Sequence, residues 1–206
     1  MANENPSVVA AVSAAFVWLQ PARLPLQRTQ SAFTIVELLV VIAIILALAG
    51  LILGTSGYVQ TKSKRARAET EIAALSVALE NYKADTGTYP TDNVGGTTNT
   101  LDARTMSNPT AAQYAAASLF LYKELSGDQT GNRVPTGKVY FPFKPNMLLP
   151  KDQTQPVIAI ADPFGHSYGY STANHVSPSM GFNPTFDLWS TAGTTGADQA
   201  PWIKNW

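Results

Sequence analysis

The longest apolar stretch of the chain extends from Ile35 to Leu53 and contains one ionisable residue, Glu37. As an α-helix it would be about 28 Å long at about 1.5 Å per residue, close to the roughly 30 Å hydrocarbon core of a bilayer. The pattern therefore predicts a membrane-spanning helix. A charge at that depth costs on the order of 2.5–3.5 kcal/mol on insertion scales, so Glu37 is a candidate functional residue that needs a cationic partner.

The same helix is predicted to continue as an amphipathic segment. All 14 prolines lie outside residues 33–89, and a proline inside a helix costs about 3 kcal/mol. Apolar side chains then recur every three or four positions, as on one face of a helix that packs on a globular body. Gly87 and Pro90 predict that the helix ends near Asp85. The apolar positions are Ile72, Leu75, Leu79 and Tyr82, and the polar ones are Glu69, Glu71, Glu80 and Lys83.

The rest of the chain predicts a small α+β body. Residues 91–108 are rich in Thr, Asn, Gly and Asp and indicate a loop, whereas residues 111–125 predict a second, shorter helix that ends at Gly127. Alternation of large apolar and other residues predicts short strands, with a turn at 162–165 between two of them. The predicted strands are residues 138–143, 157–161, 167–171 and 185–190.

These elements predict a type of fold in which a long N-terminal helix packs against a small antiparallel sheet, with a short helix in the intervening region. The expected segments are a membrane helix at 33–57, an amphipathic half at 58–85, a loop with a short helix at 86–136, an antiparallel sheet at 137–190, and a C-terminal loop and tail at 191–206.

Composition narrows the classes of function. The chain carries 14 basic and 14 acidic residues, and this neutral balance argues against a nucleic-acid binder. It has no cysteine, which excludes thiol catalysis, thiolate zinc sites and disulfides. The two histidines, His166 and His175, stand in no metal-ligand or triad-like spacing and are interpreted as structural. The order of the residues therefore indicates no catalytic constellation of serine, histidine and acid.

Residues 32–41, which read Ala-Phe-Thr-Ile-Val-Glu-Leu-Leu-Val-Val, resemble the class III signal of type IV prepilins and type II secretion pseudopilins. The resemblance implies that a prepilin peptidase removes residues 1–32 as a leader by cleaving between Ala32 and Phe33, and that it methylates the new amine of Phe33. It also implies that Glu37 guides subunit docking and that the protein is a structural subunit without catalytic activity. Such a cut would create a cation four residues before Glu37, the kind of partner that a carboxylate in lipid requires.

Later segments extend the resemblance to the major pseudopilin of type II secretion. Residues 82–91, 162–170, 186–190 and 202–206 are similar in order and spacing to motifs of that family, whereas 92–156 has no such match. The lack of cysteines favours a pseudopilin over a type IV pilin with a C-terminal disulfide. Two alternatives stay open: a type IV pilin that serves adhesion, twitching or DNA uptake, and a membrane-anchored binding or enzymatic domain that never polymerises.

The resemblance also implies partners and a location. It implies a helical homo-oligomer that meets the prepilin peptidase, an inner-membrane assembly platform and minor pseudopilins, with membrane lipid around the helix before assembly. The precursor would lie in the bacterial inner membrane with its C-terminal body in the periplasm, and the filament would be periplasmic or extracellular. No nucleic-acid partner is expected.

A stripe of small residues follows one face of the membrane helix. Small residues let helices approach closely where lipid removes the hydrophobic driving force, so this face is a candidate for packing against neighbouring subunits. The alternative is that alanine and glycine are simply frequent in such segments. Because glycine weakens a helix by about 1 kcal/mol relative to alanine, we also expect a bend or loosening at residues 50–57 in a filament. The stripe consists of Ala43, Ala47, Gly50, Gly54 and Gly57.

A basic cluster follows the membrane run. It carries four cations, whereas two arginines, Arg23 and Arg28, precede the run, and the positive-inside rule would place the body in the cytoplasm. The resemblance implies export of the body, and this is the orientation that we expect. Contact with lipid head groups or with acids of a neighbouring subunit is the expected role of the cluster. Its members are Lys62, Lys64, Arg65 and Arg67.

Two further segments leave alternatives open. Residues 8–19 form a short apolar run that suits a secretory signal or an upstream extension from a misassigned start codon. Near the other end, the resemblance implies a calcium ion in the loop 191–200, for which Asp198 is the one acidic candidate. Calcium prefers several oxygens and commonly more than one carboxylate. The loop is therefore either calcium-bound through Asp198 or metal-free and held by Trp202 and Trp206.

Overall fold

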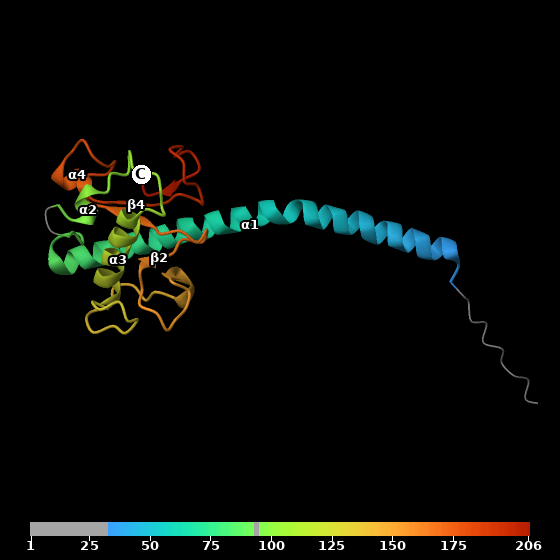
Figure 1. Ribbon diagram of the computed structural model, residues 1–206, viewed down its shortest axis with the longest axis horizontal. Helices are drawn as coiled ribbons and strands as arrows, with labels where there is room; N and C mark the ends of the chain where they lie inside the picture. The colour runs from blue at the N-terminus through green and yellow to red at the C-terminus, as the bar shows by residue number, and fades with distance from the viewer. Residues whose placement is uncertain (1–32, 93–94) are drawn as a thin grey trace, which may run out of the picture. The chain divides into compact units, whose positions relative to one another are not determined.

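The computed structural model describes residues 33–92 and 95–206 (Figure 1). Contacts divide the chain after Leu48: residues 33–48 form the first part of helix α1, and residues 49–206 contain the rest of that helix and every other described element. The helices are α1 (Ile35–Thr86), α2 (Thr97–Thr100), α3 (Ala112–Ser126), η1 (Pro145–Met147, a 3-10 turn) and α4 (Ala173–Val176). The strands are β1 (Leu148–Leu149), β2 (Ala159–Ile160), β3 (Gly169–Ser171), β4 (Asp187–Ser190) and β5 (Ile203–Lys204).

Glycine ends both long helices, as the sequence predicts. Gly87 follows α1 with φ +85°, and its N–H donates to the carbonyl of Lys83 at 2.8 Å. Gly127 follows α3 with φ +71°, and a Cβ there would lie 2.7 Å from the carbonyl oxygen of Gly137. Both positions need a left-handed backbone, and Gly127 also needs the space that a side chain would fill.

The strands form two small antiparallel sheets. In the first, β1 pairs with β2, with Leu148 opposite Ile160. In the second, the order is β3-β4-β5, with Gly169 opposite Trp189 and Ser190 opposite Ile203. The predicted strands at 157–161, 167–171 and 185–190 thus contain β2, β3 and β4. The predicted turn at 162–165 is also present, since the Gly165 N–H donates to the Asp162 carbonyl at 3.0 Å.

The strand predicted at residues 138–143 is wrong. The N–H groups of Tyr140 and Phe141 both donate to the carbonyl of Leu125, at 2.8 and 2.9 Å, and so satisfy the end of α3 instead of a sheet. Pro142 has no N–H to offer a ladder. The alternating aromatic side chains reflect packing on the core, where Phe141 and Phe143 lie half-buried.

Five short elements of the described chain lie outside the predicted helices and strands, and η1 (145–147) and α4 (173–176) are two of them. The segment 91–108, interpreted as a loop, contains the one-turn helix α2, and the segment interpreted as a C-terminal tail supplies β5. The strand β1 also falls in a region without a predicted element. Elements of two to four residues are too short to show a period of 2.0 or 3.6, so the pattern of side chains carries no signal for them.

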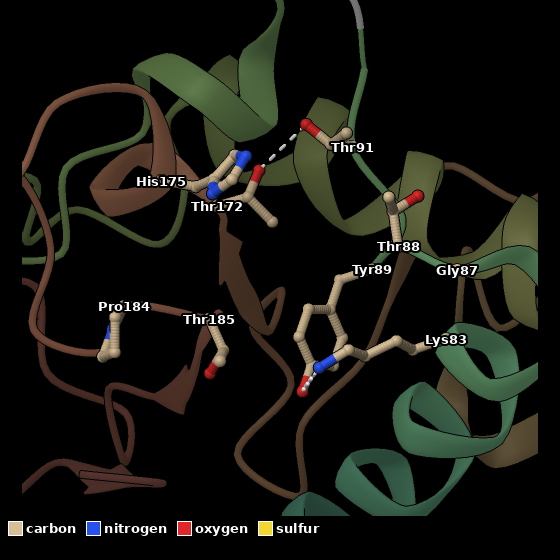
Figure 2. Close-up of a pocket in the computed structure, with 9 residues that line it drawn as sticks. All are labelled: Lys83, Gly87, Thr88, Tyr89, Thr91, Thr172, His175, Pro184 and Thr185. Carbon is tan, nitrogen blue, oxygen red and sulfur yellow. Dashed lines mark hydrogen bonds between the residues drawn. The ribbon is translucent and has the colours of Figure 1, made fainter.

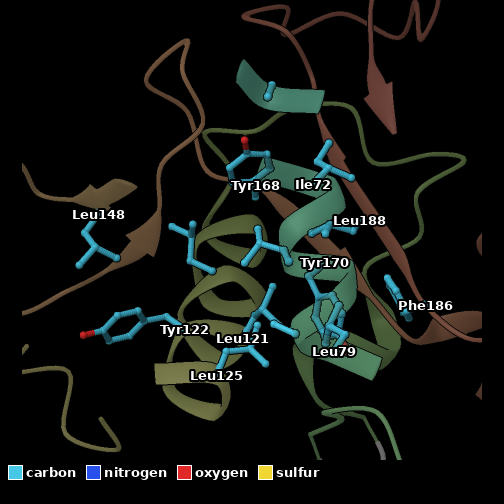
Figure 3. Packing of buried hydrophobic residues seen from close by; sticks show 14 of the residues in the cluster. Ile72, Leu79, Leu121, Tyr122, Leu125, Leu148, Tyr168, Tyr170, Phe186 and Leu188 are labelled. Carbon is cyan, nitrogen blue, oxygen red and sulfur yellow. The ribbon is translucent and has the colours of Figure 1, made fainter. Parts of the chain in front are cut away.

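The predicted amphipathic face of α1 forms one side of the main core. Ile72, Leu75 and Leu79 are buried against α3, which contributes Leu121 and Leu125, and against residues of β3 and β4 (Figure 3). Helix α3 also packs directly on β2 and β3. The prediction of an α+β body in which this half of the long helix packs on a small antiparallel sheet is confirmed.

Tyrosine hydroxyls link the elements around this core. Tyr168, which precedes β3, donates to Glu71 of α1 at 2.8 Å, and Tyr82 of α1 donates to Glu124 of α3 at 2.7 Å. Tyr170 donates to the carbonyl of Pro90 at 2.7 Å, and burial raises the pKa of its hydroxyl well above the usual range. These bonds satisfy polar groups at the core boundary and fix α1 against the rest of the body.

A buried aspartate closes the turn after α3. Asp128 accepts the Tyr122 hydroxyl at 3.0 Å and the N–H groups of Thr130, Gly131 and Arg133 at 3.2, 2.9 and 2.7 Å. Burial alone would raise the pKa of this carboxyl, but these bonds, with a further one from the Thr130 hydroxyl, hold it below its usual value. The carboxylate form therefore stabilises the fold.

We expect Asp128→Asn to lower stability at neutral pH by about 1–3 kcal/mol, because an amide cannot accept this whole set of bonds. Since the folded pKa is lowered, the contribution is present above the unfolded value of about 3.9 and is lost as pH falls through the folded pKa. The difference in melting temperature from the unsubstituted chain should shrink from pH 7 to pH 3. Circular dichroism measures it, with the exposed Asp152 in D152N as control, and a constant difference would refute the assignment.

Candidate functional site

Glu37 lies in the first turn of α1 and forms a reciprocal pair with Thr34. The N–H and hydroxyl of Thr34 each donate to Glu37 Oε2 at 2.9 Å, and the N–H of Glu37 donates to the Thr34 hydroxyl at 3.2 Å. This is a capping box, in which two N–H groups that the helix start leaves unpaired are satisfied. The capping box is not among the features predicted from the sequence, although the Thr-x-x-Glu spacing carries its signal.

Among the residues that the structure describes, no cation pairs with the charge of Glu37. Its carboxylate accepts from the neutral N–H and hydroxyl of Thr34, and the ion pairs within the described residues are Arg67–Glu71 and Lys138–Asp85. The surrounding side chains from Phe33 onwards are apolar and exposed, and α1 contains a segment apolar and long enough to cross a membrane. In such apolar surroundings a carboxylate is unfavourable unless a cation pairs with it, and the described residues of its own helix supply none.

The structure describes one side of the predicted processing site. Phe33 is described, exposed and directly before the capping box, whereas Ala32 and the leader at 1–32 lie outside the described residues. The cleavage between Ala32 and Phe33 and the methylation of Phe33 therefore stay predictions.

The stripe of small residues also stays a prediction. At Gly50, Gly54 and Gly57, no atom of the described chain outside the local backbone lies within 4 Å of the position that a Cβ would take. These glycines therefore serve no packing need within the described body. Ala43 and Ala47, the other two members, are exposed as well.

The basic cluster is largely engaged by the chain itself. Arg65 Nη1 donates to the carbonyl of Pro201 at 2.6 Å, and Arg67 Nε contacts Glu71 Oε1 at 2.6 Å. Lys64 Nζ lies 5.8 Å from the ring centroid of Phe164. Lys62 Nζ lies 5.3 Å from the ring centroid of Tyr58, so all four cations of the cluster have a contact within the described chain.

The histidines take no part in a catalytic arrangement among the described residues. The backbone N–H of His166 donates to Asp162 Oδ1 at 2.8 Å as part of the turn before β3. His175 lines a surface hollow together with Lys83 and Tyr89, which contact each other (Figure 2). The hollow holds threonine hydroxyls but no acid among its lining residues, so no nucleophile, base and acid converge there.

The candidate calcium ligand has unsuitable surroundings. Asp198 is exposed, is the one carboxylate of the loop 191–200, and accepts the Ala200 N–H at 2.9 Å through Oδ1. Within the described residues, no three acidic or histidine side chains cluster as metal ligands. The hydroxyl of Thr191 is buried with no partner in the described part of the chain, but one neutral oxygen does not replace a second carboxylate. This donor set does not fit a calcium ion.

The fold and this site together define a class of protein. A long helix that begins with a capped glutamate in an apolar segment and then packs on a small antiparallel α+β body is the type IV pilin-like architecture. Residues 27–53 match the prokaryotic N-terminal methylation motif, and residues 57–133 match the family described as type II secretion system (T2SS), protein G.

Curated relatives agree with these matches. The chain is 37% identical over 103 residues to the type II secretion system core protein G of Escherichia coli K12, which covers 50% of this chain and 68% of that protein. It is 40% identical over 86 residues to the core protein G of Aeromonas hydrophila, over 42% of this chain and 56% of that protein. The protein belongs to the type II secretion system protein G family, the family of major pseudopilins. No solved structure is significantly similar to the chain.

These relatives are matched in part. The chain spans about half to two thirds of the length of the two proteins just compared, and the match to the protein G family ends at residue 133. Family membership and the α+β architecture follow from the comparisons and the structure. What this chain assembles with, and where, is a matter of proposal.

Proposed function

We propose that this protein is the major pseudopilin of a type II secretion system: a structural subunit, not an enzyme, that polymerises through its N-terminal helix. The observation that carries the proposal is Glu37, which is capped at the start of an exposed apolar helix and has no cationic partner within residues 33–92 and 95–206. An intramembrane carboxylate is unfavourable unless it finds a cation, and the methylation-motif match supports a new amine at Phe33.

The proposed mechanism uses three groups. Cleavage after Ala32 frees the amine of Phe33, and the amine of an incoming subunit pairs with Glu37 of a neighbour already in the filament. The capping box holds the carboxylate of Glu37 at the helix start through Thr34, so its position is fixed before a partner arrives. The pairing sets the stagger between subunits because every other register leaves a carboxylate unpaired in an apolar bundle.

The remaining assignments follow from this mechanism. The exposed stripe of Ala43, Ala47, Gly50, Gly54 and Gly57 would pack against neighbouring helices, where small residues allow close approach. The precursor would be anchored in the inner membrane with a periplasmic body, would meet prepilin peptidase, the assembly platform and minor pseudopilins, and would end in a periplasmic pseudopilus. Calcium through Asp198 is not part of this proposal.

The test is the N-terminus and the assembly state of the protein isolated from cells. We expect intact-mass spectrometry to give a chain that begins at N-methylated Phe33, and chemical cross-linking to give a ladder of multimers. Deletion should leave exoproteins in the periplasm if the filament serves secretion. A chain that still begins before Ala32, or one that is monomeric after trimming, would contradict the proposal, and long surface filaments with normal secretion would favour a type IV pilin instead.

A further inference from the structure

The last eight residues, 199–206, form a segment that we term the C-terminal clasp. Trp202, 4% exposed, stacks on Trp189 of β4 with ring centroids 6.1 Å apart and planes 6° apart. Trp206 stacks on Phe182 with centroids 4.6 Å apart and planes 12° apart. The middle and the last residue of the clasp are therefore held by aromatic packing on residues that precede the loop 191–200.

Between the two tryptophans, Asn205 extends the pairing of β4. Its Oδ1 accepts the Leu188 N–H at 2.9 Å, its Nδ2 donates to the Phe186 carbonyl at 3.1 Å, and its own N–H donates to the Leu188 carbonyl at 3.2 Å. One side-chain amide thus continues the sheet beyond β5. An acid here could not donate to the Phe186 carbonyl when ionised. An aliphatic residue would leave the Leu188 N–H of β4 without this acceptor, and the Phe186 carbonyl, just before β4, would keep only its bond from Asn183 Nδ2 at 3.2 Å.

The start of the clasp is tied to two other parts of the body. Gln199 Nε2 donates to the carbonyl of Ala103 at 2.8 Å, and Arg65 of α1 donates to the carbonyl of Pro201 at 2.6 Å. Trp202 N–H donates to the Gln199 carbonyl at 3.1 Å and closes a turn between them. The loop 191–200 is therefore fixed at its C-terminal side by direct bonds from α1 and from the segment after α2.

The carboxylates nearest in sequence to the loop are engaged elsewhere. Asp187 accepts the N–H groups of Phe182 and Asn183 at 2.8 and 2.9 Å. Asp162 accepts the Ser190 hydroxyl at 2.5 Å, besides two N–H groups of its own turn. Drawing either acid to a cation beside Asp198 would break bonds that hold β4 and the turn before β3.

We infer that the C-terminal clasp closes the loop 191–200 without a divalent cation, so that the folded body does not depend on calcium. The loop is joined to the body by aromatic stacking, by the Asn205 amide and by the Arg65 contact. A cation is therefore not needed to join them. The inference concerns the folded subunit and is independent of whether the subunit polymerises.

The test uses the full-length mature protein in detergent. We expect its melting temperature and the near-ultraviolet circular dichroism of its tryptophans to be the same in EGTA and in millimolar calcium chloride, and calorimetric titration with calcium to show no saturable heat. A rise of several degrees with calcium that the Asp198→Asn substitution removes would overturn the inference. Because these readouts need no filament, they fail or succeed separately from the proposed function.

A variant of the clasp tests its positive role. Asn205→Ala should lower the melting temperature by at least about 3 °C, since it removes the side-chain bonds to the Leu188 N–H of β4 and to the Phe186 carbonyl. The control is Asn81→Ala at an exposed position of α1, which should change the melting temperature little. Calcium should not restore the Asn205→Ala variant. Rescue by calcium, or an unchanged melting temperature, would contradict the clasp. If Asn205→Ala does not fold, the EGTA comparison on the unsubstituted chain still decides.

Discussion

Replacing Glu37 by glutamine is expected to leave the chain inserted and trimmed but to reduce filament yield by about a hundredfold. A charge in the hydrocarbon costs about 2.5–3.5 kcal/mol, and pairing with a neighbour's amine relieves this cost. Glutamine is neutral, so the variant loses this favourable free energy of assembly, and about 1.4 kcal/mol corresponds to a factor of ten. Glutamine still accepts from Thr34 and keeps the helix start. The measurement is the amount of sheared filament relative to total mature protein.

Two further variants separate charge from capping. Thr34→Val removes the hydroxyl of the capping box and costs the helix start about 0.5–2 kcal/mol, but it keeps the carboxylate for a neighbour's amine. It should therefore assemble better than Glu37→Gln. Glu69→Gln changes an exposed glutamate of the same helix outside the apolar run and should assemble normally. Equal yields from Glu37→Gln and Glu69→Gln would refute the pairing mechanism.

The sequence alone marks Glu37 as a candidate assembly residue, but it does not give the hydrogen-bond geometry of that residue. An isolated carboxylate in an apolar run is visible because composition and length alone set its cost. The capping box depends on where α1 begins, and the apolar pattern does not mark that position, because residues on both sides of Thr34 are apolar. The Thr-x-x-Glu spacing could have supplied it, since the residue types at the first and fourth positions of a helix start have a known hydrogen-bond pattern.

The fold was predictable where a period lasts several turns. Ile72, Leu75 and Leu79 repeat long enough to define a buried face, and Gly87 and Gly127 mark helix ends because a left-handed backbone excludes most other residues. The failure at residues 138–143 has the opposite cause. Alternating aromatics indicate a strand only when backbone partners lie alongside, and here the carbonyl of Leu125 takes two of the N–H groups. Such long-range partners are invisible in a local pattern.

The C-terminal clasp shows the same limit at another site. Trp202 and Trp206 were recognisable as anchors of the last residues, but their partners, Trp189 and Phe182, come from segments that only the fold brings together. Arg65 was assigned to a membrane-proximal charge cluster, whereas its contact is the carbonyl of Pro201, far along the chain. The charge of a side chain follows from the sequence, but the group that the side chain contacts in the fold does not.

Replacing Leu79 by alanine is expected to have the largest effect on stability. Leu79 is fully buried in the core between α1, α3 and the sheet, and such truncations cost about 2–5 kcal/mol (Figure 3). Since domains of this size are stable by about 5–15 kcal/mol, the loss is a large fraction of the total. Guanidinium denaturation of the mature chain in detergent, followed by tryptophan fluorescence, should give a midpoint well below that of the unsubstituted chain.

Val77→Ala is the matched control, because Val77 lies two residues earlier on the same helix and is 61% exposed. It should move the denaturation midpoint little, since its side chain already lies largely in water. Comparison with the assembly variant then separates two failures: Leu79→Ala should lose filaments together with folded body, whereas Glu37→Gln should lose filaments while the body denatures at the normal midpoint. If Leu79→Ala and Val77→Ala had equal midpoints, the packing of α1 on the body would be wrong, and with it the use of α1 as the element that carries the body into a filament.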